Sequence, residues 1–202
     1  DPVTPSEFGD GLLMRQGLTI VWVGWQFDLP DEPGLLRLHV PVATDDGRPI
    51  VGLVRSDWTV DEPVSTLALA HRDHVAYPAL EDRQADAVLT ERDGRLAPRR
   101  VVPRHRWRFG REVGGRVDDD RTHIYMPGGF RPGKIYELVY HARDPAVVGL
   151  GLAVIRDVVA YAKHDPEAPF PARAGIAFGV SQTGRFLRHF LYQGFNEDEQ
   201  GR

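Results

Sequence analysis

The chain has 202 residues, 42% of them hydrophobic and 27% charged, which is the composition of a globular protein with a hydrophobic core. The formal net charge is −4 with histidine neutral and the basic residues are scattered, so nucleic acid is not expected as a partner. Cysteine is absent, which excludes disulfides and cysteine-ligated metals, and no apolar run approaches the roughly 20 residues of a membrane helix.

The first predicted elements are a helix end and a buried strand. Residues 11–17 are typical of a helix closed by a glycine cap at Gly17. Residues 18–25 are apolar, β-branched and aromatic with almost no alternation, which predicts a buried strand. A helix, a glycine and a buried strand form one step of an α/β sheet. Because the chain opens on the last turn of a helix, we expect it to lack what precedes that helix.

From residue 31 the pattern changes to short strands separated by turns rich in Pro, Gly and Asp. A short helix is predicted over residues 83–91. Sustained helical periodicity is missing for about a hundred residues. The chain is therefore divided into a first part of an α/β core, a β-rich insertion and a second part of the core, at residues 1–30, 31–132 and 133–202. The strands predicted within the insertion cover residues 35–43, 50–55, 64–70 and 124–126.

Three stretches of the insertion could carry a function. His71 and His74 are spaced as two metal ligands can be, but no obvious third ligand is nearby. Residues 118–120 are all aspartate but lack the alternating ligands and glycine of a calcium loop, so a solvated turn is expected. Trp107 and Phe109 lie between arginines and could stack on a sugar or a base, although a strand with arginines facing water is the favoured interpretation. We predict no metal and no cofactor.

Regular elements return at residue 133. Residues 134–140 predict a strand, which Asp144 and Pro145 end. Residues 147–164 carry the best helical pattern in the chain, with one continuous apolar face. A last helix is predicted from Gln182 to about Tyr192.

The strongest functional signal lies between the last two helices. A short apolar run ends at Gly179, Ser181 follows two residues later, and a helical pattern begins at once. This order predicts a nucleophile elbow, in which a strand and a helix flank a sharp turn that carries the nucleophilic serine. Thr183 stands where the commoner pattern has glycine, and Gly184 follows it.

Two other interpretations of the same stretch are open. The spacing of its glycines is that of a phosphate-binding loop, but Arg185 replaces the lysine and Phe186 replaces the hydroxyl residue that such a loop requires. A tight strand-to-helix turn with an incidental serine is the other alternative.

The order strand, helix, strand, serine turn and helix resembles the central half of an α/β-hydrolase. The chain is similar to a bacterial group named alpha/beta hydrolase domain-containing proteins, over residues 9–26, 133–140, 149–157 and 181–201. Its most specific segment is Ser181-Gln182-Thr183-Gly184-Arg185-Phe186-Leu187-Arg188. The resemblance implies a partial α/β-hydrolase sheet with helices on both faces and a β-rich insertion, in a fragment of a longer chain.

The resemblance also implies roles for individual residues. Ser181 would be the nucleophile, with a histidine as its base and an acid that orients the histidine. The backbone N–H of Gln182, at the positive end of the following helix, would stabilise the oxyanion. A second oxyanion donor would come from a loop after a neighbouring strand, and Trp25 and Ala142 are both candidates.

The base and the acid are not evident in the chain. In this fold they follow the nucleophile, yet the chain ends 21 residues after Ser181. His189 lies about two turns along the same helix and points away from the serine. Three upstream histidines, His105, His141 and His164, would break the order of the family. We therefore expect the acid and the histidine on the remainder of the same protein or on another chain, which would also complete the sheet and cover its edges.

The leading hypothesis is thus a serine hydrolase that cleaves small carboxylic esters through an acyl-enzyme on Ser181. An amidase or peptidase on the same machinery is a variant. The alternative is a non-catalytic ligand-binding protein on a degenerate hydrolase fold. We expect a soluble protein, and the sequence leaves open whether it is cytoplasmic or exported.

Overall fold

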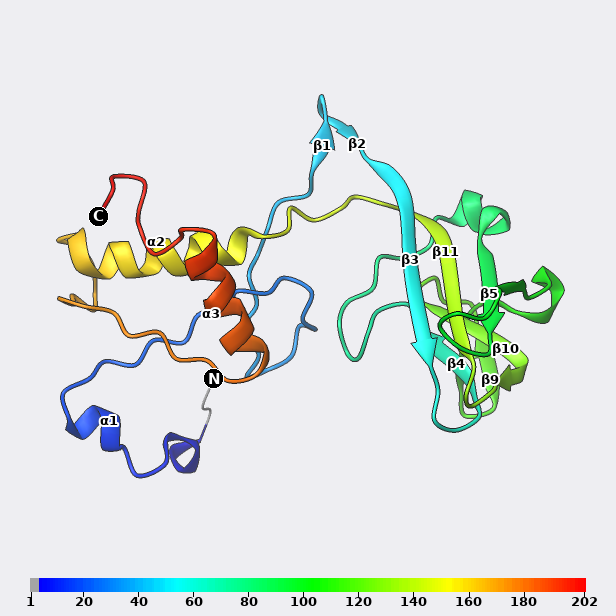
Figure 1. The fold of residues 1–202 in the computed structure, drawn as a ribbon, viewed down its shortest axis with the longest axis horizontal. Coiled ribbons are helices and arrows are strands. Elements are labelled where there is room, and N and C mark those ends of the chain that lie inside the picture. Colours follow the sequence, from blue (N-terminus) through cyan, green and yellow to red (C-terminus); the bar gives the residue numbers. More distant parts are fainter. Residues whose placement is uncertain (1–3) are drawn as a thin grey trace. The chain divides into compact units, whose positions relative to one another are not determined.

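The computed structural model describes residues 4–202, which form two compact units (Figure 1). The chain up to Val40 and Val147–Arg202 make up one of them, the helical unit. Pro41–Ala146 make up the other, the β unit. None of the helices that the structure describes has the length and apolar character needed to cross a bilayer.

The larger sheet of the β unit has four antiparallel strands in the order β3-β11-β5-β6. Its centre is β11 (Ile135–Arg143), which pairs along its whole length with β3 (Val51–Thr59). On its other side β11 pairs with β5 (Val88–Arg92), and β6 (Arg100–Val101) follows. The pairs β3-β11 and β11-β5 therefore join strands that are far apart in the sequence, whereas β6 pairs with the nearby β5.

A second sheet has the order β4-β10-β7 and is also antiparallel. Its strands are β4 (Val64–Ala68), β10 (His123–Phe130) and β7 (Arg108–Phe109). Two small hairpins and two 3-10 turns complete the unit. They are β1 (Thr44–Asp45) with β2 (Arg48–Pro49), β8 (Arg111–Val113) with β9 (Arg116–Asp118), η2 (Glu81–Asp86) and η3 (Arg104–Arg106).

The hydrophobic core of the β unit depends on the alternation of β11. Every second residue, beginning with Tyr136, points into the core, while the residues between them point to the opposite face of the sheet. The Tyr140 hydroxyl is buried and donates a hydrogen bond to the Tyr77 carbonyl at 2.8 Å. The buried core comprises Val60, Leu69, Ala79, Ala87, Leu89, Val102, Trp107, Phe109, Ile124, Met126, Phe130, Tyr136, Leu138, Tyr140 and Ala142.

The described residues of the helical unit form four helices joined by extended segments. They are η1 (Pro5–Phe8), α1 (Leu12–Arg15), α2 (Leu150–His164) and α3 (Gln182–Tyr192). The extended segments pass close to α2 at two glycines. A Cβ added at Gly151 would lie 2.3 Å from the Trp25 carbonyl oxygen, and one added at Gly175 would lie 3.2 Å from Val159. The Trp25 ring also packs on the Phe186 ring of α3, with the ring centroids 4.4 Å apart.

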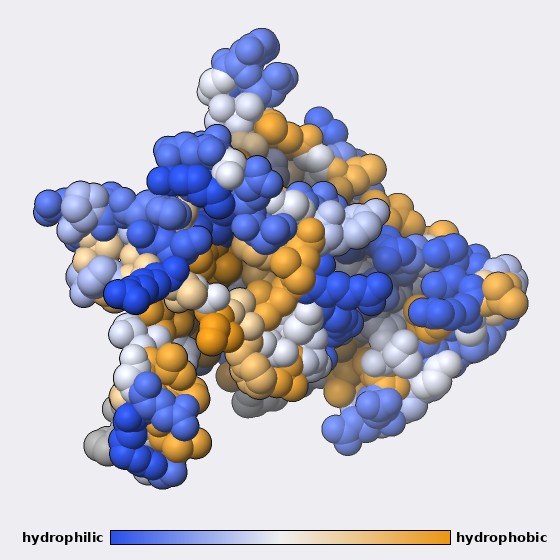
Figure 2. Space-filling model, turned by 60° about the vertical axis from the view of Figure 1, so that its left-hand side comes forward, coloured by the Kyte–Doolittle hydropathy of each residue, from blue (hydrophilic) through white to orange (hydrophobic). Residues whose placement is uncertain are grey.

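The prediction of a partial α/β-hydrolase sheet with helices on both faces is wrong for this structure. Within residues 4–202 all sheets are antiparallel and lie in the β unit, and neither residues 18–25 nor residues 174–180 form a strand. An apolar, β-branched run favours extended backbone, but a strand also needs a neighbour for its hydrogen bonds, and composition does not supply one. Ile176 and Phe178 are instead 87% exposed. Apolar side chains are accordingly visible on the surface in Figure 2.

Two smaller predictions are corrected in the same way. Residues 35–43 form no strand, and only Val42 makes an isolated bridge, to Ala146. Residues 83–91 do not form one helix, because the 3-10 turn η2 ends at Asp86 and β5 starts at Val88. In both regions the backbone follows the partners available in three dimensions rather than the local pattern.

Candidate active site

Ser181 has a strained backbone conformation directly before α3. Its φ is 54° and its ψ is −111°, and α3 begins at the next residue. A residue other than glycine in this region costs of the order of 1–3 kcal/mol, and such residues concentrate at functional sites. The side chain is exposed and makes no capping hydrogen bond to α3. The turn therefore presents a free hydroxyl at the start of a helix.

Two glycines allow this turn to form. A Cβ added at Gly179 would lie 2.6 Å from the carbonyl carbon of Thr183, closer than Cβ atoms approach in real structures. A Cβ added at Gly184 would lie 3.1 Å from the Gly179 carbonyl oxygen. The chain before the serine thus touches the first turn of α3. The close contact falls at position 184, so position 183 can carry a side chain.

Thr183 uses that freedom to fix the residue before the serine. Its Oγ1 accepts a hydrogen bond from the Val180 N–H and donates one to the Val180 carbonyl, each at 2.8 Å. The Thr183 N–H also donates to the Val180 carbonyl, at 3.2 Å. Inside the helix the Arg185 N–H donates to the Ser181 carbonyl at 3.0 Å. Val180 is therefore held from both sides, which limits how Ser181 can relax.

The N-terminus of α3 supplies the electrostatics of the site. In the part of the chain that the structure describes, the backbone N–H of Gln182 has no hydrogen-bond partner. The first amides of a helix carry the positive end of its dipole. A negative charge that develops on a group bound to Ser181 would meet this end of the helix.

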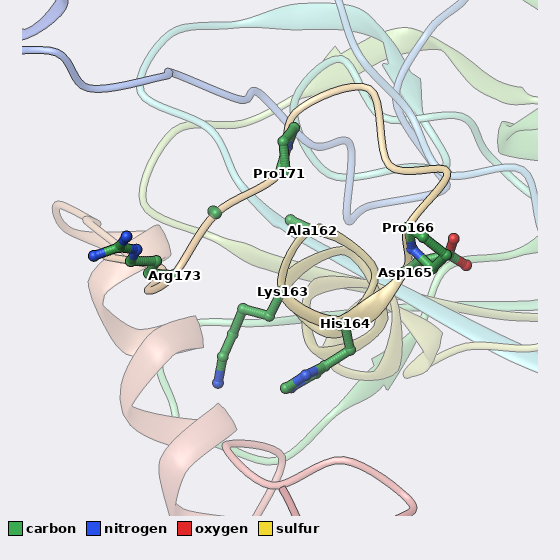
Figure 3. A pocket seen from close by; sticks show the side chains of 8 residues that line it. Ala162, Lys163, His164, Asp165, Pro166, Pro171 and Arg173 are labelled. Carbon is green, nitrogen blue, oxygen red and sulfur yellow. The ribbon is translucent and has the colours of Figure 1, made fainter.

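Of the histidines set aside above, His164 and His189 lie in the same unit as Ser181, and neither makes a hydrogen bond to the serine hydroxyl. Among residues 4–202 no hydrogen bond joins Ser181 to a histidine or a carboxylate. His189 is on α3 and stacks on Tyr192, with the ring centroids 6.3 Å apart. His164 ends α2 and lines a groove of about 440 Å³, together with Lys163 and Arg173 (Figure 3). His105 and His141 belong to the β unit.

The two candidates for the second oxyanion donor lie in different units. Trp25 is in the helical unit, where its ring packs on Phe186 of α3 and its carbonyl oxygen faces Gly151. Ala142 is in the β unit, buried within β11 and paired in register with Gly52. Trp25 therefore contacts the helix that follows the serine.

The other stretches that the sequence analysis considered as sites take part in the fold of the β unit. Within the described residues no group of three His, Asp or Glu side chains could hold a metal ion. The Asp120 carboxylate accepts a hydrogen bond from the Thr122 N–H and pairs with His123 Nδ1 at 2.9 Å. Trp107 and Phe109 are buried in the core, and the Arg104 guanidinium covers the Trp107 ring at 4.2 Å. Neither ring is open to a sugar or a base.

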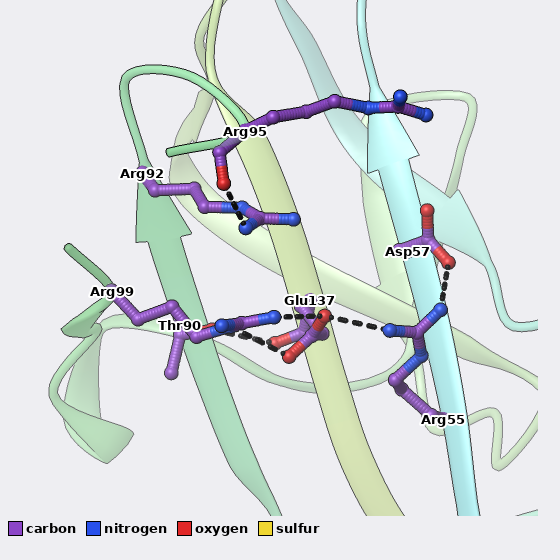
Figure 4. A network of polar contacts seen from close by, with 7 residues as sticks. All are labelled: Arg55, Asp57, Thr90, Arg92, Arg95, Arg99 and Glu137. Carbon is purple, nitrogen blue, oxygen red and sulfur yellow. Dashed lines mark hydrogen bonds and ion pairs between the residues drawn. The ribbon is translucent and has the colours of Figure 1, made fainter. Parts of the chain in front are cut away.

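The sequence did not reveal a buried carboxylate on β11. Glu137 is buried and is contacted by arginines from other segments of the chain (Figure 4). Hydrogen bonding from Arg99 is the main cause that lowers the pKa of Glu137 below its ordinary value. One signal was available, because Glu137 stands inside the apolar strand 135–140, where a charge is out of place unless it is paired.

No protein-family model, curated protein or solved structure matches the chain.

Proposed function

We propose that the protein is a serine hydrolase that cleaves carboxylic esters of small molecules through an acyl-enzyme on Ser181. The observation that carries this proposal is the strained, exposed Ser181 at the N-terminus of α3. A strained residue is retained where the surrounding structure forces it, and here Gly179, Gly184 and Thr183 do so.

The proposed reaction has two steps. The Ser181 Oγ attacks the ester carbonyl, its proton passes to a histidine, and the alcohol leaves with that proton. Water then attacks the acyl-enzyme, the acid is released and the serine is restored. The Gln182 N–H faces the oxygen on which negative charge develops in both steps. The scheme uses no metal and no organic cofactor.

The histidine and the acid come from outside this chain in this proposal. Among the described residues of the helical unit no histidine makes a hydrogen bond to the Ser181 hydroxyl, and we propose that the base is delivered to it. It would be carried by the remainder of the same protein or by another chain. The exposed apolar residues before the serine, Ile176 and Phe178, offer a surface that such a segment could cover.

A fluorophosphonate probe tests the proposal on the full-length protein. We expect a single covalent adduct, mapped by mass spectrometry to the peptide with Ser181 and lost in Ser181→Ala. Ser6→Ala is the matched control, because Ser6 is also exposed and should not affect labelling. An unlabelled full-length protein that also fails to hydrolyse short-chain esters would overturn the proposal and favour a ligand-binding protein.

A further inference from the structure

The outer face of the β3-β11-β5-β6 sheet carries a cluster of arginines. Strand alternation turns Tyr136 and Leu138 into the core and Glu137 to the opposite face. Glu137 lies opposite Asp57 of β3 and Thr90 of β5, so the side chains of these residues share the outer face. The same face carries the arginine cluster, which comprises Arg55, Arg92, Arg95 and Arg99 (Figure 4).

Two of these arginines form ion pairs with the carboxylates of this face. Arg99 binds Glu137 through two parallel hydrogen bonds, from Nε at 2.9 Å and from Nη2 at 3.1 Å. Arg55 bridges Glu137 at 3.1 Å and Asp57 at 3.2 Å. Both carboxylates on this face are therefore already neutralised by Arg55 and Arg99.

The other two arginines have no carboxylate partner among the described residues. Arg92 donates from Nη1 to the Arg95 carbonyl at 2.8 Å, and its Nε is buried without any hydrogen-bond partner. Arg95 is exposed and makes no ion pair within residues 4–202. In Figure 4 dashed lines join Arg99 to Glu137 and Arg92 to the Arg95 carbonyl, and the Arg95 side chain extends across the same face. Four guanidinium groups thus face two carboxylates, which leaves an excess of two positive charges.

Such an excess favours an anion. Positive charge without a compensating carboxylate destabilises the folded protein, and a bound oxyanion would offset it. The planar guanidinium fork matches the oxygens of phosphate. A phosphate monoester is close to a dianion at neutral pH, so its charge matches the excess on this face.

Exposed apolar residues border the cluster. Val88 is two residues from Thr90 on β5, and Val101 of β6 lies opposite Thr90, so both share the outer face with Glu137. Leu53 is two residues from Arg55 on β3 and is 66% exposed, and Val101 is 67% exposed. A ligand held at the arginines would therefore place its remaining part against aliphatic side chains.

We propose that this face of the β unit binds a phosphate monoester with an apolar organic group, its phosphate at Arg92 and Arg95 and its apolar part on Val101. Glu137 and Asp57 hold Arg99 and Arg55 through the ion pairs described above. The site belongs to the β unit and Ser181 to the helical unit, so Ser181→Ala should bind the ligand as tightly as the wild type.

Calorimetric titration of the whole chain with phenyl phosphate, inorganic phosphate and benzoate tests the proposal. We expect phenyl phosphate to bind several-fold more tightly than inorganic phosphate, and benzoate to bind most weakly because it carries a single charge. Arg95→Gln and Arg92→Gln should each weaken phenyl phosphate about tenfold. Arg48→Gln is the control, since Arg48 is exposed on β2, outside the cluster.

Circular dichroism melting of each variant keeps the test decisive. Arg95 is exposed, so Arg95→Gln should keep the wild-type melting temperature, and its loss of binding reports on the site alone. Equal weakening by Arg95→Gln and Arg48→Gln would show that only general positive charge attracts the anion, and would overturn the site. Equal affinity for phenyl and inorganic phosphate would overturn the apolar part of the proposal, and no binding of either would overturn all of it.

Discussion

Replacing Thr183 by valine tests whether the turn at Ser181 is built for a reaction. Valine has nearly the same shape but removes both side-chain hydrogen bonds to Val180, each 2.8 Å long. Near the surface each hydrogen bond contributes about 0.5–1 kcal/mol net, so Thr183→Val removes about 1–2 kcal/mol of stabilisation from the turn. That is comparable to the strain of about 1–3 kcal/mol stored at Ser181, so the turn should relax. The population with Ser181 in its present conformation should fall about 5–30-fold.

The assay is the second-order rate constant for fluorophosphonate labelling of the full-length protein, measured across pH. We expect Thr183→Val to lower it by the same 5–30-fold at every pH, because the base is untouched. Thr183→Ser keeps the hydroxyl and should retain most of the rate. A Thr183→Val protein that labels as fast as the wild type would refute the reasoning that these bonds hold the serine. A wild type that does not label at all would instead refute the hydrolase.

Three further predictions concern packing and ionisation. Gly179→Ala should abolish labelling, because its Cβ would lie 2.6 Å from the Thr183 carbonyl carbon, and near-ultraviolet dichroism should show the local change. Hydrogen bonding from Arg99 lowers the pKa of Glu137 in the folded protein. The contribution of Glu137 to stability is therefore full at a pH above the ordinary pKa of a glutamate and is lost as the pH falls below that pKa. The free energy of unfolding measured in urea should therefore fall in acid, and Glu137→Gln should reduce this dependence on pH. Burial raises the pKa of Tyr140 to about 12, so stability should fall as the pH rises above about 10, and Tyr140→Phe should remove this alkaline loss in the same urea assay.

The local pattern was sufficient where an element is determined by its own residues. The helix predicted from Gln182 to about Tyr192 is α3, and the best helical pattern of the chain contains α2. The strand predicted over residues 134–140 lies largely within β11. In each case the period of the apolar residues matches the face that is buried or packed. The sharp turn before α3 was also visible, because Gly179 and Gly184 mark a close approach of two backbone segments.

The pattern was insufficient where partners decide the structure. Residues 18–25 have a strand-like composition, but in the structure Trp25 packs on α2 and α3 and no strand forms there. The arginines around Glu137 come from positions up to 82 residues away, and no local period brings Arg55 to Glu137. Charged residues spaced along strands look like a solvated face until the register is known.

The β unit begins and ends at the same place, and this has a consequence for the order of events during synthesis. Val42 bridges Ala146, and the Ala43 N–H donates to the Pro145 carbonyl at 2.8 Å. All partners of its strands are thus present once residue 146 has left the ribosome. The segment around Trp25, by contrast, has to wait for Gly151 and Phe186. The β unit can therefore fold before the segment around Trp25 meets its partners, because the contact between Val42 and Ala146 closes it on itself.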